Sequence, residues 1–184
     1  VTREDFTDWI IETGWGTGTY TYGSGAGSID IDMLTNPSPF GAGNYQNNLQ
    51  SMAFQVFDLN AYGAASAAVS FYADINIEED YDWLVFLYNP SGSRPGLSNP
   101  DYFLNAFSGN YGGLGYAGEY DLTLLLNNDI SMGFYFESDY SDNYKGSGIG
   151  WFDVTRLYLN NTACLYSAGT SMAAPHVTGV VAMA

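Results

Sequence analysis

The chain has 184 residues, and twenty Asp and Glu against four Lys and Arg give it a formal net charge of −16 at pH 7. Such a surface repels the phosphates of nucleic acids and anionic lipids, so we expect neither a nucleic acid nor a membrane as partner. The 46% of hydrophobic residues and 17% of aromatic residues exclude a disordered chain, because disordered chains lack the large side chains that a core needs. The single cysteine, Cys164, excludes an internal disulfide and a multi-cysteine metal site.

Short apolar or aromatic runs alternate with clusters of Gly, Asn, Asp and Ser from Phe6 to about Leu159. This pattern is typical of strands and their turns. It predicts a mainly β fold, a two-sheet, jelly-roll-like β-sandwich that fills residues 1–162. The expected strands, in chain order, are Ser28–Asp32, Met52–Leu59, Ala67–Ala73, Trp83–Tyr88, Tyr120–Leu126, Ser131–Glu137 and Ile149–Leu159.

A different pattern begins after the β region, in residues 163–184. Ala, Met, Val and Gly replace the β-type alternation, which predicts a short C-terminal helix. Its apolar residues fall on all sides, as in a buried helix. So short a helix is marginal alone, and we expect it to belong to a separate, partial domain whose core is larger than this segment.

Residues 169–179, Gly-Thr-Ser-Met-Ala-Ala-Pro-His-Val-Thr-Gly, resemble the active-site serine segment of the subtilases, the subtilisin-like serine proteases of peptidase family S8. The resemblance implies that Ser171 is the acylating nucleophile of a secreted serine endopeptidase. It also implies that the helix is part of a subtilase α/β core and that the parent hydrolase acts on protein or peptide substrates. A serine at a helix N-terminus lies beside free N–H groups, which can stabilise an oxyanion.

The catalytic partners of Ser171 are missing from the chain. The only histidine, His176, follows it by five residues, a rise of about 7.5 Å and a rotation of about 140° along a helix, so His176 leaves a different face and cannot be its base. The aspartate and histidine segments that the family places earlier are absent. We therefore expect the isolated chain to be inactive, and its status as an enzyme stays open.

The β region is similar to the immune-inhibitor-A and MAM-type sandwiches of secreted bacterial proteases, on the evidence of Phe54–Leu59 and Gly150–Val154. This resemblance implies an accessory domain inserted near the substrate cleft. An alternative is a module that binds a carbohydrate or a protein surface through exposed aromatic side chains. The tyrosines expected to be exposed, all in Gly-rich segments, are Tyr20, Tyr22, Tyr111 and Tyr116.

The excess of carboxylates suggests a third function, a spacer stabilised by Ca²⁺, which takes six to eight oxygen ligands. Acidic side chains gather at Asp30 and Asp32, in residues 78–82 and in residues 139–143. The alternative for each cluster is a solvated acidic face. Asp153, between two apolar residues, is expected to face a cation, Arg156 or water. The candidate ligands of a structural calcium are Asp30, Asp32, Asp80, Asp82 and Asp153, and no organic cofactor is expected.

Overall fold

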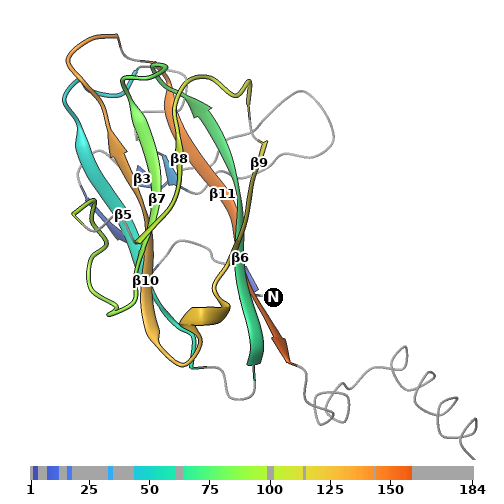
Figure 1. The fold of residues 1–184 in the computed structure, drawn as a ribbon. Helices are drawn as coiled ribbons and strands as arrows, with labels where there is room; N and C mark the ends of the chain where they lie inside the picture. Colours follow the sequence, from blue (N-terminus) through green and yellow to red (C-terminus); the bar gives the residue numbers. More distant parts are fainter. Residues whose placement is uncertain are drawn as a thin grey trace, which may run out of the picture.

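A computed structural model describes residues 2–3, 8–12, 16–17, 33–34, 44–60, 64–98, 102–113, 115–142 and 144–158 of the chain. Two antiparallel sheets pack face to face as two layers (Figure 1). Sheet A has the order β3-β4-β11-β6-β9, with β1 also paired to β11, and sheet B has the order β2-β5-β10-β7-β8. The mainly β, sandwich-like architecture expected from the sequence is therefore confirmed.

Apart from the pairs β3–β4 and β7–β8, consecutive strands along the chain lie in different sheets. Consecutive long strands β5, β6 and β7 lie in sheets B, A and B, and β10 and β11 lie in B and A. Sheet A is built from β1 (Thr2–Arg3), β3 (Gly16–Thr17), β4 (Met33–Leu34), β6 (Ala64–Asn76), β9 (Gly115–Asp121) and β11 (Gly146–Tyr158). Sheet B is built from β2 (Ile10–Ile11), β5 (Gln50–Asp58), β7 (Trp83–Asn89), β8 (Phe103–Phe107) and β10 (Asp129–Glu137), and a 3-10 helix, Thr123–Leu125, follows β9.

The core lies between the sheets and is rich in phenylalanine. Alternate residues of the long strands face inward, so β6 supplies Phe71, β7 supplies Phe86 and β10 supplies Phe134. The Phe71 ring lies 4.8 Å from the Phe134 ring and 4.9 Å from the Phe86 ring, centroid to centroid, in edge-on contacts. Each such buried side chain stabilises the fold by about 1.5–3 kcal/mol. The sandwich therefore has a core of its own among the described residues.

The outer face of sheet B carries a second, smaller apolar group. Met52, Phe54, Val85 and Leu87, here called the outer cluster, are buried although they face away from the core. The segment after β7 returns across this face, since the Ser131 hydroxyl of β10 donates to the Ser93 carbonyl oxygen. The chain thus covers this face of the sheet with its own residues.

An ion pair fastens that segment to the N-terminal part of the chain. The Arg94 guanidinium lies 2.6 and 2.9 Å from the two carboxylate oxygens of Glu12, next to β2. Glu12 in turn accepts the backbone N–H of Met52 and donates its own N–H to the Met52 carbonyl oxygen, each at 3.0 Å. Arg94 and its hydrogen bond lower the pKa of Glu12 from its usual range.

Several sequence expectations are corrected or left open. The strand expected at Tyr120–Leu126 instead begins at Gly115 and ends at Asp121, because the Asp121 carboxylate accepts the Thr123 N–H and starts the 3-10 helix. Strand β8 is not among the strands expected from the sequence. The strand expected at Ser28–Asp32, the C-terminal helix and the domain boundary at residues 162 and 163 lie outside the described residues. Within the described part of the chain, no helix has the length and apolarity to cross a bilayer.

Candidate functional site

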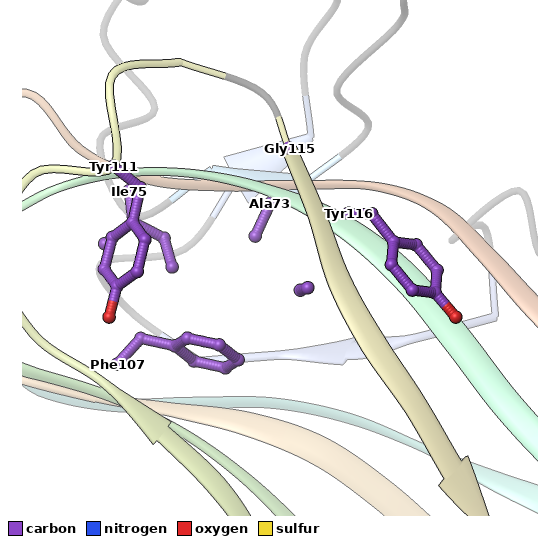
Figure 2. A pocket seen from close by; sticks show the side chains of 7 residues that line it. Ala73, Ile75, Phe107, Tyr111, Gly115 and Tyr116 are labelled. Atoms are coloured by element: carbon purple, nitrogen blue, oxygen red, sulfur yellow. The ribbon is translucent and has the colours of Figure 1, made fainter.

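Three tyrosines gather where β9, an edge strand of sheet A, begins. Tyr111 and Tyr116 are 59% and 56% exposed, as the Gly-rich sequence around them predicts, and Tyr72 of β6 is half-buried. Figure 2 shows Tyr111 on one side of β9 and Tyr116 on the other. We call Tyr72, Tyr111 and Tyr116 the tyrosine edge.

Backbone contacts fix the position of Tyr111. Its N–H donates to the Ile75 carbonyl oxygen at 3.0 Å, and Asn110 forms an isolated bridge with Asn76 at the end of β6. The Asn110 side chain then accepts the Gly112 N–H at 2.8 Å, and Gly112 has a φ of 76°, which a residue with a Cβ rarely adopts. Tyr111 is therefore held on a turn rather than on a free loop.

A small apolar pocket lies at the start of β9, and Tyr111 and Tyr116 are both among its lining residues. Its volume is about 160 Å³, and Phe107 at the end of β8 is part of its wall (Figure 2). The Tyr120 hydroxyl supports β9 next to the pocket, since it accepts from Asn105 of β8 at 2.8 Å and donates to the Ala117 carbonyl oxygen at 3.0 Å. The lining residues are Ala73, Ile75, Phe107, Tyr111, Gly115, Tyr116 and Ala117.

Tyr116 and Tyr72 form a cross-strand pair on sheet A. They are register partners, and their rings meet edge to face with centroids 5.5 Å apart. Desolvation, together with the charge of Glu119 and the neighbouring Tyr72, raises the pKa of Tyr116. The Tyr116 hydroxyl therefore keeps its proton at neutral pH and can both donate and accept a hydrogen bond.

Small side chains continue along the outer face of β6 from Tyr72. The inner positions of β6 belong to the core, so Ser66, Ala68 and Ser70 face outward, and each is half-buried. We call these three residues the small-residue strip. On β9, Glu119 is the register partner of Ser70 and Asp121 that of Ala68, and both are exposed.

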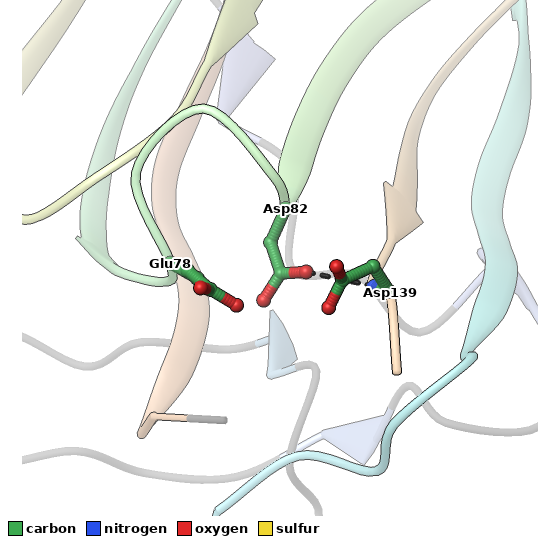
Figure 3. Close-up of side chains that lie close together, drawn as sticks. All are labelled: Glu78, Asp82 and Asp139. Carbon is green, nitrogen blue, oxygen red and sulfur yellow. Dashed lines mark hydrogen bonds between the residues drawn. The ribbon is translucent and has the colours of Figure 1, made fainter. Parts of the chain in front are cut away.

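A cluster of carboxylates lies elsewhere, where the chain crosses between the sheets. Glu78 and Asp82 come from the β6–β7 loop and Asp139 follows β10, and one carboxylate oxygen of each lies within 4.8 Å of the others (Figure 3). We call them the acidic cluster. Asp82 is fully buried, and Tyr45 donates its hydroxyl to it. Burial and this hydrogen bond raise the pKa of Tyr45 well above its usual value.

The donors around the acidic cluster do not match its acceptors in number. The Ser141 hydroxyl lies 2.6 Å from an Asp139 oxygen and 2.9 Å from a Glu78 oxygen, but it has only one proton to donate. The Asp139 N–H donates a hydrogen bond to a carboxylate oxygen of Asp82, at 2.8 Å. Carboxylate and hydroxyl oxygens from separate loops are the ligands that a hard cation such as Ca²⁺ takes, so the donor set fits calcium. Its binding stays a prediction.

Of the calcium ligands expected from the sequence, the structure places those that it describes in different parts of the fold. Among these candidates, only Asp82 belongs to the acidic cluster; its other members, Glu78 and Asp139, lie in the acidic segments noted in the sequence but are not among the expected ligands. Asp80 is exposed, with a φ of 68°, and Asp153 lies in β11. Arg156 donates instead to the Asp58 carbonyl oxygen at 2.5 Å, since residues three apart on a strand face opposite sides. Asp30 and Asp32 lie outside the described residues, as do Ser171, His176, Tyr20 and Tyr22.

Comparisons with known proteins complete the description of the site. No family model matches the chain, and no curated protein matches it. Among solved structures, the chain is similar to the carbohydrate-binding module TmCBM61 in complex with β-1,4-galactotriose. The identity is 12% and the TM-score 0.45, with 83% of this chain and 90% of that chain covered. A likeness at this level assigns neither a ligand nor a residue role to this chain.

The comparisons overturn the expectation of a subtilisin-like protease fragment. No family model of a protease matches, and a solved structure that the chain is similar to is a carbohydrate-binding module. The protease interpretation depended on eleven residues, 169–179, whereas the described residues form a β-sandwich without a serine-protease triad among them. The protease function and its peptide substrate are therefore withdrawn, whereas Ser171 and the expected C-terminal helix lie outside the described residues.

Proposed function

We propose that this chain is a carbohydrate-binding β-sandwich module whose binding site is the tyrosine edge. The observation that carries the proposal is that Tyr111 and Tyr116, each more than half exposed, both contribute to the lining of a small apolar pocket. Sugar rings have apolar C–H faces that stack on aromatic side chains, while hydroxyls around the ring need polar partners. The tyrosine edge offers both, since every ring carries a hydroxyl.

The position of the tyrosines on the sandwich also supports the proposal. Tyr72 and Tyr116 project from paired strands, and Tyr111 is fixed by its backbone hydrogen bond to Ile75. Side chains held in this way lose little conformational freedom when a ligand binds, which favours affinity. Exposed aromatic side chains on a rigid edge are better explained by a ligand than by packing, because a core would bury them.

Isothermal titration calorimetry against neutral oligosaccharides tests the proposal. We expect Tyr111→Ala and Tyr116→Ala each to lower the affinity about tenfold or more, which corresponds to about 1.4 kcal/mol. Tyr140→Ala is the matched control, since Tyr140 is 80% exposed and lies in the loop after β10, away from the pocket lining. Its affinity should equal that of the unsubstituted chain. Absence of binding to every neutral glycan tested, or equal loss in the control, would contradict the proposal.

Two further expectations accompany this proposal. A protein surface could occupy the same tyrosines, and a panel that includes proteins as well as glycans separates the two kinds of ligand. We also propose a secreted location, where polysaccharides are accessible. Detection of the protein in the culture medium of its source cells checks this.

A further inference from the structure

We propose that the apolar pocket at the start of β9 receives a small apolar substituent of the glycan, an acetyl or a methyl group, while the sugar ring that carries this group lies against Tyr111. This inference rests on the proposed function, and it names the class of ligand: a neutral glycan whose hydroxyls are partly acetylated or methylated.

The pocket lies where the edge strands of the two sheets meet. Phe107 ends β8, the edge strand of sheet B, and Ala117 belongs to β9, the edge strand of sheet A. Ala73 and Ile75 of β6, both buried, complete the apolar walls (Figure 2). The Tyr111 ring, 59% exposed, contacts the Phe107 ring edge-on with centroids 6.3 Å apart. A group inside the pocket is therefore next to an exposed ring on which a sugar can stack.

A β-bulge in β9 shapes the pocket wall. The pairing with β6 shifts between Tyr116 and Gly118, so Ala117 is one extra residue on β9. Gly118 has a φ of 128°, which residues with a Cβ rarely adopt. The Tyr120 hydroxyl donates to the Ala117 carbonyl oxygen at 3.0 Å and accepts from Asn105 of β8 at 2.8 Å, so the bulge is fastened to the other sheet. Bulges recur next to binding sites, and this one makes the pocket a preformed feature of the fold.

The chemistry of the walls favours an apolar group over a ring that carries hydroxyls. Among the lining residues that the structure describes, none is charged, and only the two tyrosines have a polar group in their side chains. A whole sugar inside the pocket would press hydroxyls against Ala73, Ile75 and Phe107, and a buried hydroxyl without a partner weakens binding. A methyl group needs no such partner, and an acetyl group can leave its carbonyl oxygen at the mouth.

The size of the pocket fits the same class of group. Its volume is about 160 Å³. An apolar cavity of about 150 Å³ is large enough for a bare ring of six carbons. A pyranose with its hydroxyls is larger than such a ring, whereas an acetyl or methyl group is smaller. The substituent therefore enters the pocket, and the sugar ring stays outside.

Calorimetry with modified and unmodified forms of the same glycan tests the inference. The probes are β-1,4-linked galacto-, gluco-, manno- and xylo-hexamers, each in an unmodified, a partly O-acetylated and a partly O-methylated form. We expect at least one modified form to bind about tenfold more tightly than the unmodified hexamer of the same sugar. Comparison of the acetylated and methylated forms identifies the group that enters the pocket.

Two variants of the pocket lining and a matched control complete the design. Ala117→Leu places a larger side chain on the wall and should reduce the tenfold preference to less than about twofold. Gly115→Leu should do the same, and a Cβ at Gly115 meets no atom closer than the Gly113 carbonyl oxygen at 3.9 Å. Gly96→Leu is the control, since its Cβ has the same clearance, 3.9 Å from the Ser98 hydroxyl, and Gly96 is not among the lining residues. It should keep the full preference.

Melting temperatures show which variants are folded, and the possible failures are distinct. If modified and unmodified hexamers bind equally, the pocket receives no substituent and the inference is wrong, while the proposed function stands. If a folded variant of the pocket lining keeps the full preference, the substituent binds elsewhere and the inference is again wrong. If no hexamer binds in any form, the proposed function and the inference fail together.

Discussion

The two outer faces of the sandwich differ in what covers them. On sheet B, Met52, Phe54, Val85 and Leu87 are buried under residues of the same chain, which the Arg94–Glu12 ion pair and the Ser131–Ser93 hydrogen bond hold in place. On sheet A, Tyr116 of β9 is 56% exposed. The outward-facing residues Ser66, Ala68 and Ser70 of the neighbouring strand β6 have small side chains.

This difference indicates that the two outer faces have different roles, one in stability and one in binding. An apolar sheet face must be covered, and the chain does so on sheet B, where the covering contributes to stability. Tyrosine rings with solvent-exposed hydroxyls can remain open, because one end of each is polar. We therefore expect substitutions under the covering segment to change stability, and substitutions at the tyrosine edge to change binding.

The largest effect should come from Gly133, in the middle of β10. A Cβ at this position would lie 2.5 Å from both the Ala53 carbonyl oxygen and the Phe54 Cβ, so a neighbouring strand would have to move. We expect Gly133→Ala to lower the free energy of unfolding by about 3 kcal/mol, the upper end of what overpacking costs. Urea unfolding measures the change.

Gly96→Ala is the control for Gly133→Ala. The nearest atom to a Cβ at Gly96 is the Ser98 hydroxyl oxygen at 3.9 Å, so no clash arises there. This substitution should leave stability unchanged or raise it slightly, by up to about 1 kcal/mol, because alanine restricts the unfolded chain. A Gly133→Ala protein as stable as the Gly96→Ala protein would show that sheet B is packed more loosely than described.

Sheet A offers the opposite test at Tyr72. Its ring supports Tyr116 by an edge-to-face contact at 5.5 Å, so Tyr72→Ala should lower glycan affinity about tenfold, or about 1.4 kcal/mol, with a smaller loss of stability. Tyr72→Phe keeps the ring and should lose less than threefold. Calorimetry with the neutral hexamer measures both. Equal losses in the two variants would mean that the Tyr72 hydroxyl, not the ring, matters.

The sequence predicts the sandwich better than the sites. Apolar runs bounded by turn residues locate β5, β7 and β10, and each of these strands has four or five successive buried residues because both faces of sheet B are covered. Strand β8, Phe-Leu-Asn-Ala-Phe, is not predicted because it is short. Its pairing with β7 is also irregular, since the register shifts between Phe86 and Leu87 of β7. The exposure of Tyr111 and Tyr116 follows from flanking glycines, since such segments lie at the surface.

The pocket and the acidic cluster could not be predicted because both depend on contacts between distant segments. Phe107 and Ala73 are 34 positions apart, and Glu78 and Asp139 are 61 apart. Sequence proximity favoured Asp80 over Asp139, although the turn at Asp80 directs that residue to solvent. The serine segment misled for the same reason, because a local match of eleven residues says nothing about the fold of the other strands.

The acidic cluster brings carboxylates from the β6–β7 loop and from the end of β10 close together, and calcium should change its contribution to stability. Without calcium, Glu78→Gln removes one of three carboxylates within 4.8 Å and should raise the free energy of unfolding by about 1 kcal/mol. With 1 mM CaCl₂, we expect the unsubstituted chain to melt at a higher temperature and the Glu78→Gln protein to respond less. Thermal unfolding with and without a chelator measures this. If calcium does not change the melting temperature of the unsubstituted chain, the cluster is not a calcium site.

The smallest effect should be at the Arg94–Glu12 pair, which fastens the covering segment of sheet B. Because Arg94 is 48% and Glu12 34% exposed, Glu12→Gln should lower the free energy of unfolding by only about 0.5 kcal/mol, and less at 1 M NaCl. Arg94 lowers the pKa of Glu12 in the folded chain, so this stabilisation is present above the unfolded pKa of about 4.3 and disappears as the pH falls through the folded pKa.

Urea unfolding at pH 7 and pH 3 should therefore show a larger difference between the Glu12→Gln and unsubstituted proteins at pH 7 than at pH 3. Glu79→Gln, at an exposed residue, removes the same formal charge without breaking this pair and serves as the control. If both substitutions have the same effect at pH 7, net charge rather than the ion pair governs this region. The covering of sheet B would then depend on the apolar contacts of Met52, Phe54, Val85 and Leu87 alone.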